Sequence, residues 1–263
     1  MLGQNSKLEK ERTERLMIKE RYGWRARIGI ITPGLGITQT REWGNLLPEG
    51  ISFHTTLMEL VETTPEGLPQ LKAHAVVEAK KLTLTGLIDI LLFSCTSGSF
   101  VGGPGYDQEI IKELERTTGV PSTTTSTCVL GALTDLGAKN IAMVGPYIKD
   151  VSEIEIQFFK HHGIETVYCK GMGYEKVEQI IKISEQPYIY YRLAKEAHNS
   201  APDADAIFIT CMASPIAKVV NTLEQETEKP VVSSCSAALY GVLKQLGIKD
   251  AVENYGKLLR MSR

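Results

Sequence analysis

The stretch Ile88-Asp-Ile-Leu-Leu-Phe-Ser-Cys95 decides the fold, because a similar stretch, Ala204-Asp-Ala-Ile-Phe-Ile-Thr-Cys211, follows 116 positions later. Each stretch is a short apolar run that contains an aspartate near its start and ends on a hydroxyl residue and a cysteine. Near-continuous apolar runs of this length are typical of strands that are buried on both faces of a parallel sheet. The match predicts one such strand in each half of the chain.

Other landmarks repeat in the same order at similar spacing. Arg27-Ile-Gly-Ile-Ile-Thr-Pro33 parallels Asn140-Ile-Ala-Met-Val-Gly-Pro146, and Leu136-Gly-Ala-Lys139 parallels Leu246-Gly-Ile-Lys249. A shared order and offset indicates an internal duplication, with two βα units of about 110 residues each.

Short apolar runs alternate with amphipathic stretches along the whole chain. Strands are expected over 27–32, 51–57, 88–94, 122–126, 140–144, 165–170, 206–210 and 231–234. Helices are expected over 68–85, 106–117, 129–136, 151–162, 187–200, 216–226 and 237–246. This alternation predicts an α/β protein with two pseudosymmetric, Rossmann-like parallel-sheet domains and an active-site cleft between them.

Three segments are expected from this pattern. Residues 1–24 form an N-terminal helical arm, 25–127 plus 236–263 form the first α/β domain, and 128–235 form the second. The arm is dense in Lys, Arg and Glu between Lys7 and Arg21, which is typical of a solvated helix. It either stays on the surface or packs on a second subunit, so a homo-oligomer is left open.

Composition excludes several classes of function. The chain has 263 residues, 43% apolar and 23% charged, and a net charge of −2, so no bulk field favours nucleic acid or a membrane surface. The N-terminus has no apolar signal segment, and we expect a cytoplasmic protein. The five cysteines are odd in number and show no C-x-x-C spacing, which predicts free thiols and no metal site.

Cys95 and Cys211 are the candidate catalytic residues. Ligands of parallel α/β sheets bind outside the carboxyl ends of the strands, and both cysteines lie at such ends. If the duplication relates them, two thiols can face one carbon from opposite sides, and one can remove a proton while the other returns it. A lone strand-end cysteine is more often a core residue. The symmetric placement of two such cysteines favours the catalytic interpretation.

The residues around these cysteines supply candidate binding groups. In the turn Cys95-Thr-Ser-Gly-Ser99, the hydroxyls of Thr96 and Ser97 could hold a carboxylate or enediolate without a cation. The same residues also suit a helix N-cap. Tyr147 could donate a hydrogen bond into the cleft, or it could simply be packed in a loop. Met212, next to Cys211, belongs to the same expected binding set.

A second anion-binding turn is expected at Pro33-Gly34-Leu-Gly36, after the first strand. Its glycines do not complete the G-x-G-x-x-G pattern, so a dinucleotide is not expected. No lysine or arginine occurs in the cleft motifs, and carboxylate binding would depend on neutral donors. We also expect the apolar side chains of Leu57, Leu60, Val61 and Met172 to line a substituent pocket.

Together these motifs resemble the Asp/Glu racemase superfamily, and more closely its maleate isomerase and arylmalonate decarboxylase branch. The resemblance extends from about Arg27 to Lys249 and includes Thr64-Pro-Glu-Gly67 and Pro121-Ser-Thr-Thr-Thr-Ser126. It implies two pseudosymmetric α/β domains, no cofactor, and catalysis by cleft cysteines. Cys95 and Cys211 match the catalytic pair, while Thr96, Ser97 and Tyr147 match the carboxylate-binding group.

Departures from the family patterns bear on the substrate. Maleate isomerases usually carry asparagine where this chain has Gly36, and a second asparagine near Val177. Arylmalonate decarboxylases carry a residue other than cysteine where Cys95 stands. The resemblance therefore implies a cofactor-independent isomerase or racemase of a small carboxylate. The alternatives are a decarboxylase that uses Cys211 to protonate an enediolate, and a non-catalytic carboxylate-binding protein.

Overall fold

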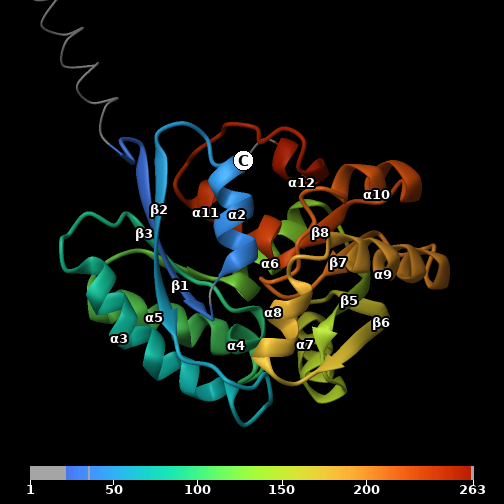
Figure 1. Cartoon of the computed structure of the whole chain (residues 1–263), viewed down its shortest axis with the longest axis horizontal. Helices are drawn as coiled ribbons and strands as arrows, with labels where there is room; N and C mark the ends of the chain where they lie inside the picture. Colours follow the sequence, from blue (N-terminus) through green and yellow to red (C-terminus); the bar gives the residue numbers. More distant parts are fainter. Residues whose placement is uncertain (1–21, 35, 262–263) are drawn as a thin grey trace, which may run out of the picture.

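The computed structural model describes residues 22–34 and 36–261 (Figure 1). The predicted helical arm over 1–24 lies, apart from its last three residues, outside this part of the chain. No helix within the described residues is long and apolar enough to cross a membrane.

Two four-stranded parallel sheets form the framework. The first contains β1 (Ala26–Pro33), β2 (Ile51–Met58), β3 (Ile90–Phe93) and β4 (Ser122–Thr124), in the order β2-β1-β3-β4. The second contains β5 (Asn140–Tyr147), β6 (Glu165–Tyr174), β7 (Ala206–Ile209) and β8 (Val231–Ser233), in the equivalent order β6-β5-β7-β8. The shared order confirms the predicted fold class.

The equivalent strands β3 and β7 are central strands that are completely buried. Each lies between two neighbours, and every residue of both strands is buried. The edge strands β2 and β6 instead contain exposed residues, which in β6 alternate along the strand. Continuous apolar sequence therefore marks the central strands, because helices cover both of their faces.

Most expected helices occur near their expected positions. They are the 3-10 turn η1 (Leu68–Gln70), α3 (Leu71–Thr83), α5 (Tyr106–Thr118), α6 (Thr125–Asp135), α7 (Lys149–His161), α9 (Pro187–Ser200), α10 (Val220–Thr227) and α11 (Ser234–Gln245). The strand expected over 122–126 is too long, because Thr124 caps α6 by accepting a hydrogen bond from the Thr127 amide at 3.2 Å.

Four helices were not expected from the sequence. They are α2 (Ile37–Leu46), α4 (Thr96–Phe100), α8 (Val177–Ile183) and α12 (Gly256–Arg260). Three of them have seven residues or fewer, and α2 contains an interior glycine and two threonines that weaken its helical signal.

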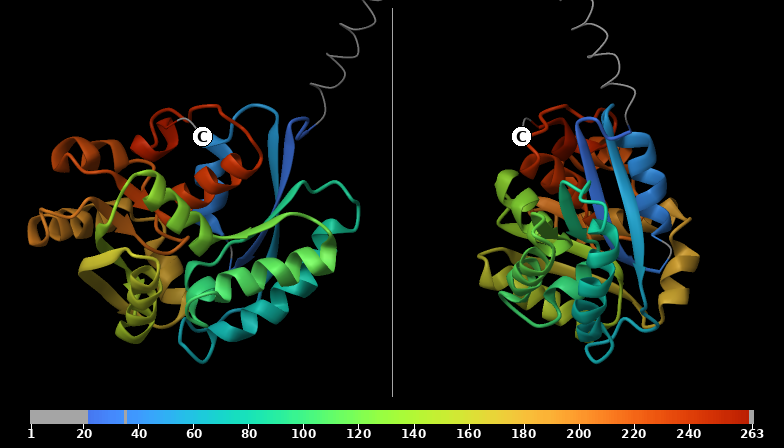
Figure 2. Two further views of the ribbon diagram at one scale, coloured as in Figure 1. Left: turned by 180° about the vertical axis from the view of Figure 1, so that it is seen from behind. Right: turned by 90° about the vertical axis from the view of Figure 1, so that its left-hand side faces the viewer.

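Helices α6 and α11 join the two halves. They follow the equivalent strands β4 and β8 and pack against each other near the centre of the molecule (Figures 1 and 2). Their close approach requires Gly241, because a Cβ there would come within 2.5 Å of the Cys128 sulfur. Trp43 of α2 also donates to the Cys235 carbonyl at 3.3 Å. The expected domain boundaries remain a prediction.

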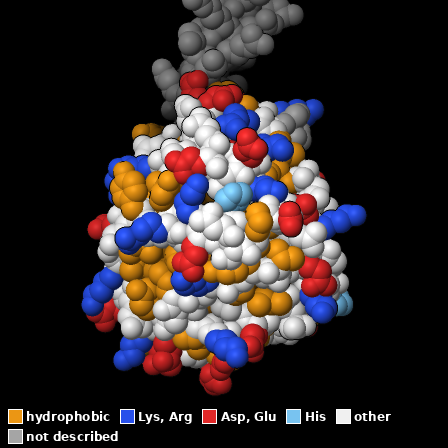
Figure 3. All heavy atoms as spheres, turned by 90° about the vertical axis from the view of Figure 1, so that its right-hand side faces the viewer, with side chains coloured by type: hydrophobic (Ala, Val, Ile, Leu, Met, Phe, Trp, Pro, Cys, Tyr) orange, Lys and Arg blue, Asp and Glu red, His pale blue; other side chains and the backbone are white. Residues whose placement is uncertain are grey.

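Basic and acidic side chains are intermixed on the face of the second half that Figure 3 shows. Ion pairs in the second half include Lys170 with Glu196 at 2.6 Å and Lys195 with Glu226 at 3.1 Å. Their side chains are 31–46% exposed, and ion pairs that water reaches contribute little to stability.

Candidate active site

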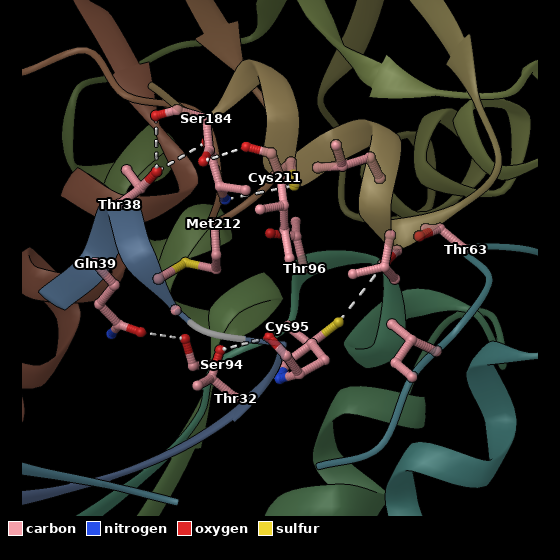
Figure 4. Close-up of a pocket in the computed structure, with 18 of the residues that line it drawn as sticks. Thr32, Thr38, Gln39, Thr63, Ser94, Cys95, Thr96, Ser184, Cys211 and Met212 are labelled. Atoms are coloured by element: carbon pink, nitrogen blue, oxygen red, sulfur yellow. Dashed lines mark hydrogen bonds between the residues drawn. The ribbon is translucent and has the colours of Figure 1, made fainter. Parts of the chain in front are cut away.

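A cavity of about 620 Å³, counting the space at its open mouth, lies where the carboxyl ends of the two sheets meet. Both candidate cysteines line it, and Figure 4 shows their side chains turned toward the same space. The lining residues come from both halves: Thr32, Pro33, Gly36, Ile37, Thr38, Gln39, Leu60, Thr63, Ser94, Cys95, Thr96, Ser97, Tyr147, Val177, Ile180, Ile181, Ser184, Cys211, Met212 and Ala213.

Cys95 follows β3 and is the N-cap residue of α4. Its sulfur accepts a hydrogen bond from the Gly98 amide at 3.4 Å and lies 3.8 Å from the Ser97 hydroxyl. A Cβ at position 98 would come within 3.1 Å of the sulfur, so glycine permits this approach. Burial raises the pKa of the Cys95 thiol to about 11, although Gly98 and Ser97 partly oppose that effect.

Cys211 stands at the equivalent place after β7, but its backbone differs. Its φ of 84° lies in the left-handed region, which is uncommon for a residue with a side chain. The sulfur accepts a hydrogen bond from the Ala213 amide at 3.5 Å. Burial raises the pKa of the Cys211 thiol to about 12, with Ala213 and Tyr147 acting in the opposite direction. Both cysteines are therefore thiols at neutral pH.

Tyr147, the last residue of β5, lies between the two cysteine turns. It is 2% exposed, and its ring packs edge-on against Phe100 of α4 at 6.5 Å. Its hydroxyl is within hydrogen-bonding reach of Ser97 and Cys211. Burial raises the pKa of Tyr147 well above its usual value, so the phenol is a neutral hydrogen-bond donor. Of the two alternatives for Tyr147, the structure places it in the cavity wall.

Thr96 supplies a second neutral donor. Its hydroxyl is buried and has no hydrogen-bond partner among the described residues. A buried hydroxyl without a partner is uncommon, because leaving it unbonded costs about 1–3 kcal/mol. No lysine, arginine, histidine, aspartate or glutamate is among the described residues that line the cavity. An anionic group bound here would be held by hydroxyl and amide donors alone.

Of the other residues predicted to bind substrate, some line the cavity and one does not. Pro33 and Met212 line the cavity, but Gly34 does not. A Cβ on Gly34 would lie 3.3 Å from Ile181, so Gly34 packs behind the wall that α8 forms. Gly34 and Gly36 both have positive φ values, 63° and 56°, which glycine adopts without strain.

Helices α2 and α8 supply cavity residues that sequence reasoning missed. Ile37 and Leu60 from the first half make an apolar wall with Val177, Ile180 and Ile181 of α8. Of the four residues expected in a substituent pocket, only Leu60 lines the cavity. Leu57, on the edge strand β2, and Val61, in the segment after it, are 50% and 66% exposed. Met172, on the edge strand β6, packs against the core outside the cavity.

Helix α2 also anchors the segment that follows Cys211. The Thr38 hydroxyl donates to the Ala213 carbonyl at 2.9 Å, and Glu42 accepts from the Ile216 and Ala217 amides at 3.0 and 2.9 Å. Tyr255 donates to the other oxygen of Glu42. The signal for this role is the four-residue spacing of Thr38 and Glu42, which places both on one face of a helix.

The described residues contain no group of three or more His, Cys, Asp or Glu side chains that could hold a metal ion. All five cysteines are free thiols. Cys128 and Cys235 are buried outside the cavity, while Cys169 is exposed on the edge strand β6.

Known proteins share this architecture. Arylmalonate decarboxylase from Bordetella bronchiseptica is 28% identical over 232 residues, which cover 88% of this chain and 95% of the relative. Maleate isomerase from Nocardia farcinica is 27% identical over 247 residues, covering 89% and 95%. A solved structure of an arylmalonate decarboxylase double variant, with glycine replaced by cysteine and cysteine by serine, in the liganded form, has a TM-score of 0.82 at 26% identity, covering 89% of this chain and 98% of that one.

A solved maleate isomerase from Pseudomonas putida S16, in a cysteine-to-alanine variant with maleate, has a TM-score of 0.80 at 25% identity, with coverage of 89% and 97%. These relatives are enzymes. The family model described as arylmalonate decarboxylase matches residues 28–259, which is most of the chain. The chain therefore belongs to the arylmalonate decarboxylase family, in the branch of the Asp/Glu racemase superfamily that also contains the maleate isomerases.

Proposed function

We propose that this protein is a cofactor-independent isomerase or racemase of a small carboxylate, in which Cys95 and Cys211 are the reacting groups. The observation that carries the proposal is the placement of two cysteines, after the equivalent strands β3 and β7, in the wall of one cavity. Thr96, Ser97 and Tyr147 provide neutral donors beside them. Such donors stabilise the charge that develops on a carboxylate as it becomes an enediolate.

In the racemase form of the reaction, one sulfur removes the α-proton as a thiolate while the other thiol donates a proton to the opposite face. In the cis–trans isomerase form, one thiolate adds to the alkene, the central bond rotates, and the thiolate leaves again. Both forms need one ionised cysteine. Because burial raises the pKa of both thiols, we expect turnover to increase with pH across the neutral and mildly alkaline range.

The apolar part of the cavity wall also indicates which class of carboxylate would fit. The wall formed by Ile37, Leu60, Val177, Ile180 and Ile181 consists of apolar side chains. Burying an unpaired carboxylate against this wall would be strongly unfavourable. We therefore propose a carboxylate that carries an apolar substituent, with the substituent lying against this wall.

A decarboxylase is the second candidate, and the family match over 28–259 favours it. In that reaction Cys211 would act only as an acid that protonates the enediolate. A thiol with a pKa of about 12 stays protonated at neutral pH, so turnover would be independent of pH below about pH 9. The pH dependence thus separates the two candidates.

The test is incubation in D₂O with maleate, chiral 2-substituted carboxylates and aryl-substituted malonates. Deuterium at the stereocentre without loss of carboxylate supports a racemase, whereas release of CO₂ supports the decarboxylase. We expect Cys211→Ala to abolish turnover in either case. Cys95→Ala should abolish isomerisation or racemisation. Full turnover in both variants would contradict the two-cysteine proposal.

A further inference from the structure

A buried carboxyl lies directly behind the Cys211 turn. Glu155, on helix α7, is fully buried, and one of its oxygens accepts a hydrogen bond from the Thr210 hydroxyl at 2.7 Å. Its other oxygen has no hydrogen-bond partner among the described residues. Glu155 does not line the cavity, so the proposed reaction makes no direct use of it.

Thr210 connects this carboxyl to the reacting cysteine. Its amide donates to the Val144 carbonyl at 2.9 Å, and its carbonyl accepts from the Ser214 hydroxyl at 2.7 Å. Its methyl group packs so closely on Gly145 that a Cβ there would come within 2.2 Å. These contacts fix the position of Thr210. Because Thr210 immediately precedes Cys211, they also restrain the Cys211 backbone, whose φ is 84°.

No cation among the described residues compensates Glu155. The ionisable groups near it are Tyr147 on β5, Cys169 on β6 and Cys211 after β7, while α4 contributes no ionisable side chain. Lys149 of the same helix pairs with the exposed Glu153 instead. Burial raises the pKa of Glu155 to about 8, although the Thr210 hydrogen bond partly opposes this effect, so the carboxyl holds its proton at neutral pH.

The effect of Glu155 on the two cysteines is unequal. Negative charge on Glu155 raises the pKa of Cys211. The other ionisable groups that face Cys211 include Tyr190 on α9 and Cys95. The pKa of Cys95 is instead set by burial, Gly98 and Ser97. A single buried group can therefore make the two symmetry-related thiols chemically different.

We propose that Glu155 is a positioning residue for Cys211: through the Thr210 hydroxyl it holds the Cys211 turn, and its own protonation decides how readily Cys211, in contrast to Cys95, releases a proton. When Glu155 is neutral, the two thiols compete for ionisation on similar terms. When Glu155 loses its proton, the thiolate form shifts toward Cys95, and Cys211 remains the acid. This inference rests on the proposed role of the two cysteines.

The experiment measures alkylation of each cysteine by iodoacetamide between pH 6.5 and 9.5, with peptide mass spectrometry to separate Cys95 from Cys211. In Glu155→Gln the amide oxygen still accepts from Thr210, but no charge can form. At pH 6.5 we expect this variant and the wild type to alkylate Cys211 at equal rates. At pH 9.5 the variant should react roughly 3- to 10-fold faster at Cys211, a shift of up to about one pKa unit, with little change at Cys95.

Thr210→Val removes the hydrogen bond and keeps the shape that packs on Gly145. Losing that bond raises the pKa of Glu155 further, so the change in Cys211 reactivity should move to higher pH. Glu153→Gln, on the exposed face of the same helix, is the matched control and should follow the wild type. An infrared band of a protonated carboxyl at neutral pH, absent in Glu155→Gln, gives a second readout that needs no thiol chemistry.

Equal pH profiles for Cys211 in wild type and Glu155→Gln would overturn the inference, and so would parallel changes at both cysteines. Alkylation needs no substrate, so this failure is distinguishable from failure of the proposed function. If the thiol profiles behave as expected but no carboxylate in the D₂O panel reacts, the proposed function is wrong while the coupling of Glu155 to Cys211 stands.

Discussion

Cys211 has a backbone conformation that its side chain disfavours, with φ at 84°, whereas Cys95 has an extended backbone with φ at −147°. Strain of this kind costs about 1–3 kcal/mol and persists where the surrounding structure imposes it. Here the surroundings are the packing of Thr210 on Gly145 and the bonds that α2 makes to the following segment. In this conformation the Cys211 side chain lines the cavity.

Replacing Cys211 with glycine or alanine tests this strain, since both variants lack the thiol and differ in backbone freedom. We expect Cys211→Gly to be more stable than Cys211→Ala by about 1 kcal/mol, because glycine adopts positive φ freely. Urea unfolding followed by circular dichroism provides the measurement. At position 95 the order should reverse, with Cys95→Ala the more stable variant. The same order at both positions would contradict the argument.

Pairing of the two cysteines could be predicted from residues alone, but their unequal environments could not. The repeated strand ends give Cys95 and Cys211 equivalent positions. The left-handed backbone of Cys211 and the carboxyl behind it depend on contacts from α2 and α7, which lie far away in sequence. No local pattern around Cys211 carries that information.

At the scale of elements, α2 is the helix that connects the halves at the site. It begins at Ile37, which lines the cavity, and it bonds through Thr38 and Glu42 to the segment after Cys211. It was not expected from sequence, because its buried residues include Thr38, Gln39 and Glu42 and do not form an apolar stripe. Polar groups on this helix are buried because they anchor another chain segment.

Removing one of these anchors should loosen the Cys211 segment without unfolding the protein. Thr38→Val keeps the side-chain shape and deletes the hydrogen bond to Ala213, at an expected cost of about 1 kcal/mol in stability. We expect faster hydrogen exchange in the 211–217 segment and a lower kcat. Thr40→Val, on the exposed side of the same helix, is the control. Unchanged exchange in Thr38→Val would show that α2 does not restrain the segment.

On the scale of the whole molecule, alternating strands and helices predicted two matching sheets, and the structure confirms them with the same strand order. The apolar runs of β3 and β7 gave the clearest part of this prediction, because burial on both faces leaves a continuous apolar sequence. The apolar wall of the cavity was not predictable in the same way. Leu60 and Ile181 line the same wall only because the segment after β2 joins the start of α8, as in the bond from the Val177 amide to the Val61 carbonyl at 3.0 Å.

The buried carboxyl of Glu155 should also affect the stability of the whole fold. Its pKa is about 8 in the folded protein against 4.5 for an exposed glutamate, so between these values the folded state holds a proton that the unfolded state releases. The contribution of Glu155 to stability is therefore greatest below pH 4.5 and is lost as pH rises toward 8. The loss amounts to roughly 5 kcal/mol at most, since each pKa unit corresponds to about 1.4 kcal/mol.

The glutamine in Glu155→Gln cannot titrate. The free energy of unfolding of this variant, relative to that of the wild type, should therefore increase as pH rises from 5 to 8. The measurement is the free energy of unfolding in urea at several pH values in that range, with Glu153→Gln as the exposed control on the same helix. Glu42, whose pKa is also raised by burial, stays in all of these proteins, so its contribution cancels in the difference. A difference between Glu155→Gln and wild type that is constant with pH would mean that Glu155 is already ionised in the folded protein. The fold would then stabilise the buried charge of Glu155. No change in its protonation would occur in this pH range, so it could not control Cys211.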